Sequence, residues 1–159
     1  MEIEQTTNEI LGELQAIGSA HYRLFIIAGG SADERSVLLR NLSRYEGLEF
    51  LDTGKTLSRA LIEIEPAFRA LSASDAFSSL VSSAIEKPVC VDHIEILFDQ
   101  CLHLNPFELL KNVSRKFSLV VSWPGFLSDR ALGYAPEQHP SHFRMPLNDI
   151  ECPVHQLAE

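Results

Sequence analysis

Short apolar runs alternate along the chain with longer stretches in which apolar residues recur at helical spacing. Runs that fit strands occupy residues 22–28, 48–51, 89–91, 118–122 and 143–147. The segments between them show helical periodicity over 4–18, 37–42, 56–85 with a break at Pro66, and 94–117 with an interruption near Pro106. Alternating strands and helices predict a parallel sheet with right-handed crossover connections and helices on its faces.

The length and the composition fit a single domain. The chain has 159 residues, of which 45% are hydrophobic and 22% charged, so its core needs no metal or disulfide. We expect one α/β domain over residues 1–159, with an N-terminal helix over 1–20 and a long loop over 126–142. The expected architecture has three layers, with a central parallel sheet of about five strands.

The formal net charge of -9 argues against a protein that wraps duplex DNA, because that mode needs a basic face. Two basic strips on predicted helices are either solvated faces or local contacts for a partner: Arg35, Arg40 and Arg44, and Lys111, Arg115 and Lys116. No apolar run approaches the roughly 20 residues of a membrane span. The acidic start, with Glu2 and Glu4, is unlike a signal peptide, so we expect a cytoplasmic protein without membrane contact.

The cysteines and histidines do not suggest a metal site. Cys90, Cys101 and Cys152 lie far apart and include no C-x-x-C pair, so they are expected to be small buried side chains without disulfides. His139 and His142 are close in sequence, but a proline lies between them and no third ligand is apparent.

Residues 29–36 lie between the first predicted strand and a helix, the context in which a phosphate-binding loop occurs. They match the Walker A pattern G-x-x-x-x-G-K-[ST] only at its first and last positions, because Glu34 and Arg35 replace the second glycine and the lysine. In the functional interpretation, backbone N–H groups and the Arg35 charge bind phosphate through Gly29, Gly30, Ser31, Ala32, Asp33, Glu34, Arg35 and Ser36. The alternative is an ordinary strand-to-helix turn whose acidic residues complement the helix dipole.

A second segment, Gly54-Lys55-Thr56, resembles the end of the same motif. Glu49 stands where the first glycine belongs, and the segment follows the second predicted strand rather than the first. We therefore interpret Lys55 as a solvated loop residue.

Asp92 ends an apolar run, as the aspartate of a Walker B strand does. In that role it would hold magnesium together with Ser36. His93 replaces the glutamate that usually follows, so Glu95 is the nearest carboxylate able to polarise water. The structural alternative is that Asp92 caps the next helix.

Two further residues would complete the site of a ring-forming ATPase. Ser122 is expected on the strand between the phosphate loop and Asp92, where a polar sensor stands. Arg130 lies beyond that strand, where such ATPases place an arginine that reaches a neighbour's γ-phosphate. The alternatives are that Arg130 is an exposed arginine without this duty and that the adjacent Trp123 packs against the sheet.

The second half of the chain carries a recognisable order of residues. The order is Asp92-His93-Ile94-Glu95-Ile96-Leu97-Phe98-Asp99, Asn105-Pro106, Leu109-Leu110, Ser114-Arg115, Val120-Val121-Ser122-Trp123-Pro124-Gly125, Tyr134-Ala135-Pro136 and His139-Pro140. It resembles the BrxF family, small P-loop proteins encoded in some BREX bacteriophage-defence systems. The resemblance covers residues 24–144 and implies a defence component that acts beside a larger ATPase, a DNA methyltransferase and an alkaline-phosphatase-like protein.

These observations lead to two main hypotheses. The first is a degenerate P-loop protein that uses ATP and magnesium as an assembly switch, forms a homo-oligomer and is at most a weak ATPase. The second is an adaptor that keeps the fold without nucleotide and binds other BREX-system proteins, which the loss of the Walker lysine and glycine favours. DNA binding by an assembled oligomer is a third hypothesis, because a multimer can gather a minority of arginines on one surface.

Overall fold

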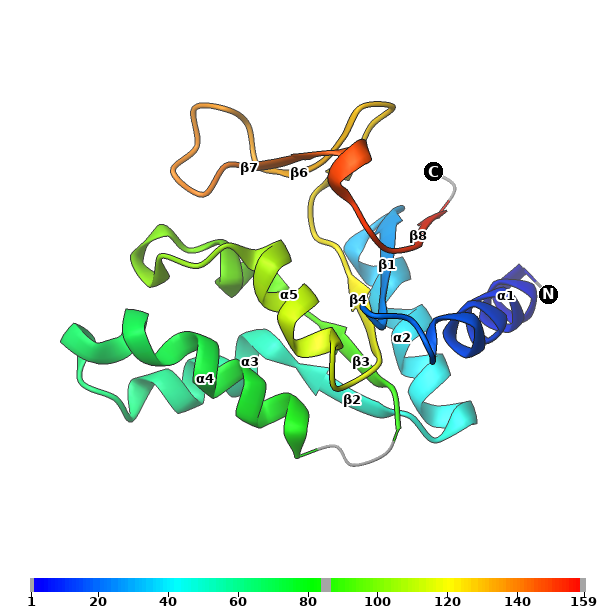
Figure 1. The fold of residues 1–159 in the computed structure, drawn as a ribbon, viewed down its shortest axis with the longest axis horizontal. Coiled ribbons are helices and arrows are strands. Elements are labelled where there is room, and N and C mark those ends of the chain that lie inside the picture. The colour runs from blue at the N-terminus through cyan, green and yellow to red at the C-terminus, as the bar shows by residue number, and fades with distance from the viewer. Residues whose placement is uncertain (1, 84–86, 158–159) are drawn as a thin grey trace.

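The computed structural model describes residues 2–83 and 87–157, and a five-stranded sheet lies at its centre (Figure 1). The strand order is β2-β3-β4-β1-β8, and every neighbouring pair is parallel. The strands are β1 (Leu24–Gly29), β2 (Glu49–Asp52), β3 (Val89–Asp92), β4 (Leu119–Ser122) and β8 (Val154–Leu157). The parallel five-stranded sheet predicted from the sequence is therefore confirmed.

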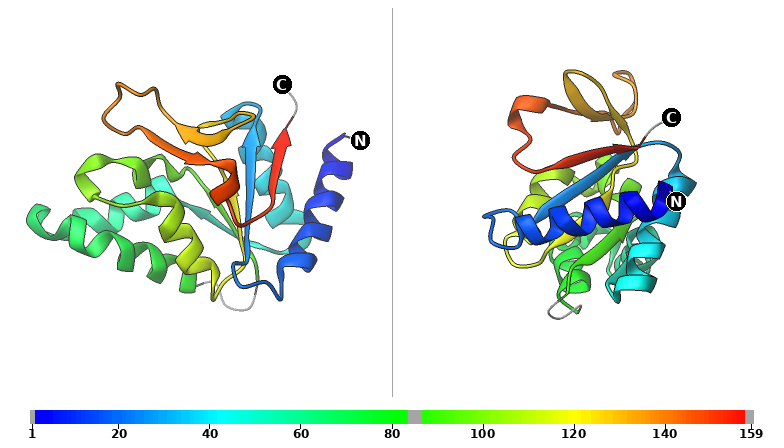
Figure 2. Two further views of the ribbon diagram at one scale, coloured as in Figure 1. Left: turned by 45° about the horizontal axis from the view of Figure 1, so that its top comes forward. Right: turned by 90° about the vertical axis from the view of Figure 1, so that its right-hand side faces the viewer.

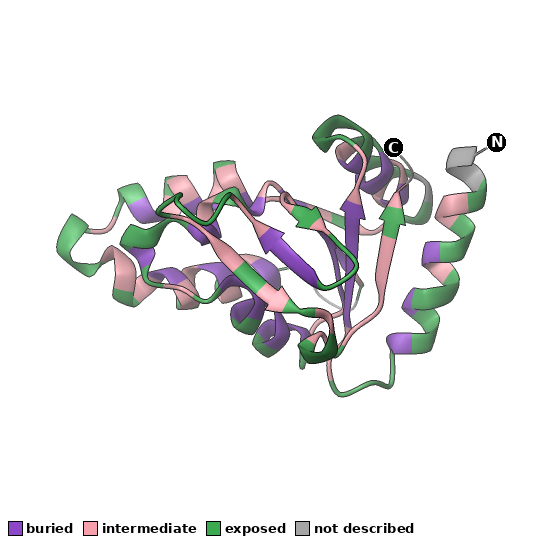
Figure 3. Cartoon of the chain, turned by 90° about the horizontal axis from the view of Figure 1, so that it is seen from above, coloured by how far each residue is buried: buried purple, intermediate pink, exposed green. Residues whose placement is uncertain are grey.

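Helices cover both faces of this sheet and give the domain three layers (Figures 1 and 2). Phe25 and Ile27 of β1 belong to a buried cluster with α1 (Glu2–Ile17) and α2 (Ala32–Glu46). Leu24 and Ile26 belong to a second cluster with α3 (Thr53–Ile62), α4 (Arg69–Ser82) and α5 (Pro106–Ser114). Figure 3 shows the buried residues in purple along the central strands and exposed residues in green on the outer sides of the helices. Burial on both faces explains why the central strands are apolar throughout.

The helix ends follow local sequence signals. Ser31 caps α2, and Gly47 closes it in the left-handed conformation, with φ of 70°. The predicted break at Pro66 is a 3-10 turn, η1 (Pro66–Phe68), between α3 and α4. Within the described ranges, no helix combines the length and the apolar composition that crossing a bilayer requires.

The helix predicted over 94–117 is shorter than expected. Its first part consists of two 3-10 turns, η2 (Ile94–Phe98) and η3 (Gln100–Leu102), and only α5 is α-helical. His93 and His103 adopt left-handed conformations, with φ of 55° and 52°, and so flank the turns with backbone that cannot continue a helix.

The segment 126–142, predicted to be a long loop, contains two strands, β5 (Phe126–Leu127) and β6 (Ala131–Tyr134). β7 (Phe143–Pro146), predicted to be the last strand of the main sheet, instead pairs with β6 in a separate antiparallel sheet of order β5-β6-β7. The last strand of the main sheet is β8, after the short 3-10 turn η4 (Leu147–Asp149). Its Val-His-Gln-Leu sequence is too short and polar to be recognised from apolar pattern alone.

The small antiparallel sheet lies beyond the carboxyl ends of the main strands (Figure 1). Trp123, which follows β4, is fully buried and joins the two sheets. Its backbone N–H donates to Ile27 O at 2.8 Å, and its indole Nε1–H donates to Gly133 O at 2.9 Å. The expectation that Trp123 packs against the sheet is confirmed, and we call residues 126–146 the roof.

The cysteines differ in their surroundings. All three are free thiols; Cys90 is buried and Cys152 half-buried, but Cys101 is exposed, so the expectation of burial was wrong for Cys101. Desolvation raises the pKa of both the Cys90 and the Cys152 thiols to about 12, and the charge of Asp92 adds to the shift at Cys90. These two side chains therefore behave as small apolar residues rather than nucleophiles.

Candidate functional site

The turn after β1 is much tighter than a phosphate-binding loop. Only Gly30 and Ser31 separate the strand from α2, so Ala32, Asp33 and Glu34 form the first turn of the helix. The Ser31 hydroxyl accepts from Glu34 N–H at 3.1 Å, while Glu34 Oε1 accepts from Ser31 N–H at 3.2 Å. This capping box places a carboxylate of the chain itself on an amide that a phosphate would need.

The paired glycines have a packing role in this turn. Gly29 and Gly30 have φ of 80° and 59°, a region that side chains disfavour. A Cβ on Gly29 would lie 2.8 Å from the carbonyl oxygen of Leu157, and one on Gly30 would lie 3.3 Å from the Leu157 Cβ. The glycines therefore allow β8 to approach the end of β1, which accounts for them without a ligand.

Arg35 turns inward and fills the space behind the turn. Only 5% of its surface is exposed. Its Nη1 donates to Gly29 O at 2.7 Å and to Gly30 O at 3.2 Å, while its Nε donates to the Ser122 hydroxyl at 3.0 Å. One guanidinium thus ties together the turn, α2 and β4, a contact set that we call the Arg35 lock.

The charge of the lock is balanced by carboxylates around it. Burial lowers the pKa of the Arg35 guanidinium, whereas the charges of Asp92, Glu95 and Glu34 raise it. Because an arginine side chain stays protonated in proteins, the site contains a permanent buried cation. The guanidinium faces the turn and β4, so it is directed away from any ligand that would bind outside the turn.

Ser36 and Asp92, the predicted magnesium ligands, lie side by side. Ser36 Oγ donates to Asp92 Oδ2 at 2.5 Å, and Asp92 is almost wholly buried. The other carboxylate oxygen of Asp92 accepts from the His93 backbone N–H at 2.9 Å, and His93 Nε2 lies 3.5 Å from Oδ2. The sequence therefore predicted this proximity correctly, but Asp92 here stabilises the left-handed turn at His93 and the start of α2.

ATP and magnesium do not fit these residues as they are arranged. A triphosphate would meet the Glu34 carboxylate at the helix end, where Glu34 Oε1 already accepts the Ser31 N–H. The basic side chain that should face the ligand instead donates to the carbonyls of the turn. In residues 2–83 and 87–157, no cluster of three or more His, Cys, Asp or Glu side chains is arranged to hold a metal ion. The assignment of residues 29–36 as a phosphate loop is thus not supported by their geometry.

The remaining predicted site residues divide into two groups. Ser122 lies on β4, which is between β1 and β3 as predicted, and it is buried against Arg35. Glu95 and Arg130 are exposed, Glu95 in η2 and Arg130 between β5 and β6. Lys55 is also exposed, and its backbone N–H donates to Asp52 Oδ1 at 3.1 Å as part of the α3 cap. The Gly-Lys-Thr segment is therefore an ordinary helix start.

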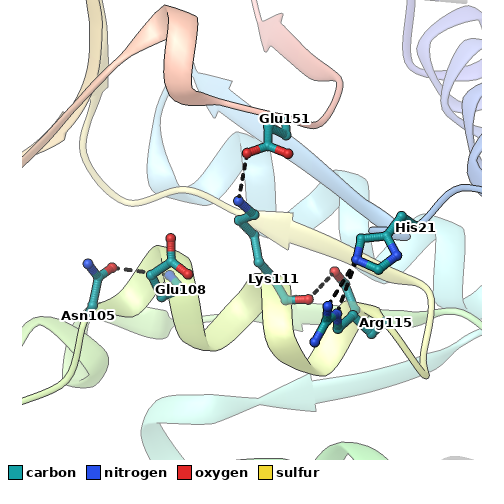
Figure 4. A network of polar contacts seen from close by, with 7 residues as sticks. His21, Asn105, Glu108, Lys111, Arg115 and Glu151 are labelled. Carbon is teal, nitrogen blue, oxygen red and sulfur yellow. Dashed lines mark hydrogen bonds and ion pairs between the residues drawn. The ribbon is translucent and has the colours of Figure 1, made fainter.

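The two predicted basic strips are not continuous basic faces. In the strip on α5, Lys111 is buried with its Nζ 3.2 Å from Glu151 Oε1, and Arg115 Nη2 lies 3.1 Å from His21 Nε2 (Figure 4). In the strip on α2, Arg35 points into the core. Three of the six cations, Arg35, Lys111 and Arg115, therefore make contacts within the chain, which weakens the case for a DNA-binding stripe.

The helical periodicity of the sequence indicates the inward position of Arg35, although the Walker motif does not. Once α2 begins at Ala32, position 35 shares a helical face with Leu38, Leu39 and Leu42, all of which are buried. The Walker pattern treats residues 32–35 as part of a loop, so it does not include them in the periodicity of the helix.

No protein-family model matches the chain, and no curated protein matches it at a significant level.

Proposed function

We propose that this chain is a nucleotide-independent adaptor, a P-loop-like α/β domain in which an internal arginine takes the place of the nucleotide. The observation that carries the proposal is the Arg35 lock, in which the guanidinium donates to Gly29 O, Gly30 O and the Ser122 hydroxyl. A working phosphate loop directs its amides and its basic side chain at the ligand. Here the basic side chain is directed at the turn itself, and the hydrogen bonds that hold the turn come from the chain's own side chains.

The assembly that the adaptor serves is proposed from the sequence resemblance. The ordered set of residues between 92 and 140 resembles the BrxF family of BREX phage-defence systems. An adaptor in such a system would bind other proteins of that system and need no turnover of its own.

A thermal-shift titration with magnesium and ATP tests the proposal. If ATP bound, a concentration one hundred times its Kd would add about 2.7 kcal/mol of stability, or a rise in melting temperature of about 5–10 °C. We expect no shift at millimolar ATP. A saturable rise of that size in the unaltered protein would contradict the adaptor function.

The double variant E34G/R35K is the matched comparison. It removes the capping carboxylate and the buried guanidinium and restores the two missing Walker A residue types. Binding that appears only in this variant would support the view that Glu34 and Arg35 exclude nucleotide from the natural site. Equal binding by both proteins would contradict it.

The second candidate is the weak ATP-binding protein, and one observation favours it. Ser36 and Asp92 are in contact, as the magnesium-holding pair of a P-loop protein must be. In this alternative Arg35 would have to leave the core before a triphosphate could enter. The titration of the unaltered protein distinguishes the two candidates, because only the second predicts a shift.

A further inference from the structure

The connection between α3 and α4 exposes an unusual amount of apolar surface. Ile62, Phe68 and Leu71 are 69%, 53% and 80% exposed, and they lie within a short stretch of chain. We call these three residues the apolar tip. Single exposed apolar residues are common, whereas several large ones gathered on one short connection indicate an interaction surface.

The turn that carries the apolar tip is held by side-chain hydrogen bonds and by packing. Arg69 Nε donates to Leu61 O at 2.8 Å and to Ile64 O at 3.0 Å, which fixes the turn from within. Behind it, α3 and α4 pack through the buried side chains Leu57, Leu61, Ala73 and Phe77. A fixed apolar surface loses little conformational entropy when it docks, which favours a specific contact.

Two carboxylates lie next to the tip in the chain. Glu63 and Glu65 are exposed beside it, and within the described residues neither of them makes an ion pair. A partner surface should therefore combine an apolar centre with basic side chains.

The outer face of α2 has that combination. Val37, Arg40 and Arg44 follow one another at spacings of about one helical turn, and all three are exposed. We call them the basic ridge. The Arg40 guanidinium lies 4.7 Å from the ring centroid of Phe50, and in the part of the chain that the structure describes neither arginine is paired with a carboxylate.

We propose that the apolar tip of one copy docks on the basic ridge of a second copy, with Glu63 and Glu65 facing Arg40 and Arg44. The tip lies at one end of the long axis of the molecule, and α2 lies towards the other end (Figure 1). In the arrangement that we propose, the tip and the ridge of each copy engage two different neighbours, so the contact is heterologous, repeats from copy to copy and gives a ring or an open chain.

Sedimentation velocity on the full chain, from micromolar to millimolar concentration, tests this contact. The unaltered protein should form species larger than a dimer. The tip variant I62S/L71S and the ridge variant R40E/R44E should each be monomeric, because truncating interface anchors weakens binding by about tenfold or more. The altered side chains are exposed, so folding is retained; the matched control is R130E/R144E, which should assemble like the unaltered protein.

Mixing the two variants gives the sharpest result. The tip variant keeps its ridge and the ridge variant keeps its tip, so an equimolar mixture should form a heterodimer and nothing larger. A chain that carries R40E/R44E together with E63R/E65R should assemble again, because the charges are exchanged across the contact.

Several results would overturn the inference. They are a monomeric unaltered protein at every concentration, assembly that stops at a dimer, a mixture that yields larger species, or loss of assembly in the control. The inference does not depend on the proposed function, because the experiment needs no nucleotide. A shift in the ATP titration would contradict the proposed function alone. Species larger than a heterodimer in the mixture would contradict the contact between tip and ridge alone.

Discussion

Replacing Arg35 by alanine should lower the free energy of unfolding by about 3–5 kcal/mol, because it leaves buried hydrogen-bonding groups unpaired and empties the volume behind the turn. The carbonyls of Gly29 and Gly30 and the Ser122 hydroxyl would lose their donor, and Asp92 would lose a nearby cation. Urea unfolding followed by circular dichroism measures the loss.

Two further variants show whether the planar guanidinium of Arg35, with its several donors, contributes to stability beyond its charge. R35K keeps the charge but cannot reach both the turn and Ser122 in the same way, so we expect it to lose about half as much stability as R35A. R130A removes an exposed arginine and should change stability by less than about 0.5 kcal/mol. A loss below about 1 kcal/mol in R35A would mean that the lock contributes little to the fold.

Replacing Trp123 by alanine should cost about 3–5 kcal/mol and should loosen the roof selectively. The indole packs edge-on against Phe98, with ring centroids 5.3 Å apart, and tilted against Phe143 at 5.9 Å. Its Nε1–H also donates to Gly133 O in β6. Hydrogen exchange read by mass spectrometry should show lost protection over 126–146, while β1, β3 and β4 keep theirs.

W123F is the control for the aromatic packing. It preserves a ring in the cluster and removes the hydrogen bond to Gly133, so its expected cost is about 1 kcal/mol with the roof still protected. Uniform loss of protection across both sheets in W123A would contradict the assignment of Trp123 as the anchor of the roof.

The layered fold could be predicted because its signals are local. Apolar runs that end at Gly29, Asp52 and Asp92 marked three strands correctly, and Pro66 marked the break between α3 and α4. The roof could not be predicted in this way. β5 spans only Phe126–Leu127, and its antiparallel pairing with β6 depends on the close approach of Gly125 to Gly133, where a Cβ on Gly125 would lie 1.8 Å from Gly133 O.

The sequence predicted which residues of the candidate site lie near one another better than it predicted what their side chains do. The sequence correctly placed Ser122 between β1 and β3, and the contact of Ser36 with Asp92 agrees with the Walker interpretation. It could not reveal the direction of the Arg35 side chain, because a motif specifies residue types while burial depends on where the helix begins. Starting α2 at Ala32 rotates Arg35 onto the apolar face and leaves Glu34 at the capped end.

Nuclear magnetic resonance of the amide groups in the turn tests the central claim most directly, since the claim is that Arg35 closes this turn to phosphate. The Gly30 and Ser31 amide resonances of the unaltered protein should stay in place as magnesium and ATP are added to millimolar concentration. Saturable shifts of these two amides, with Ser122 shifting in parallel, would show that a triphosphate enters the turn and would contradict the account.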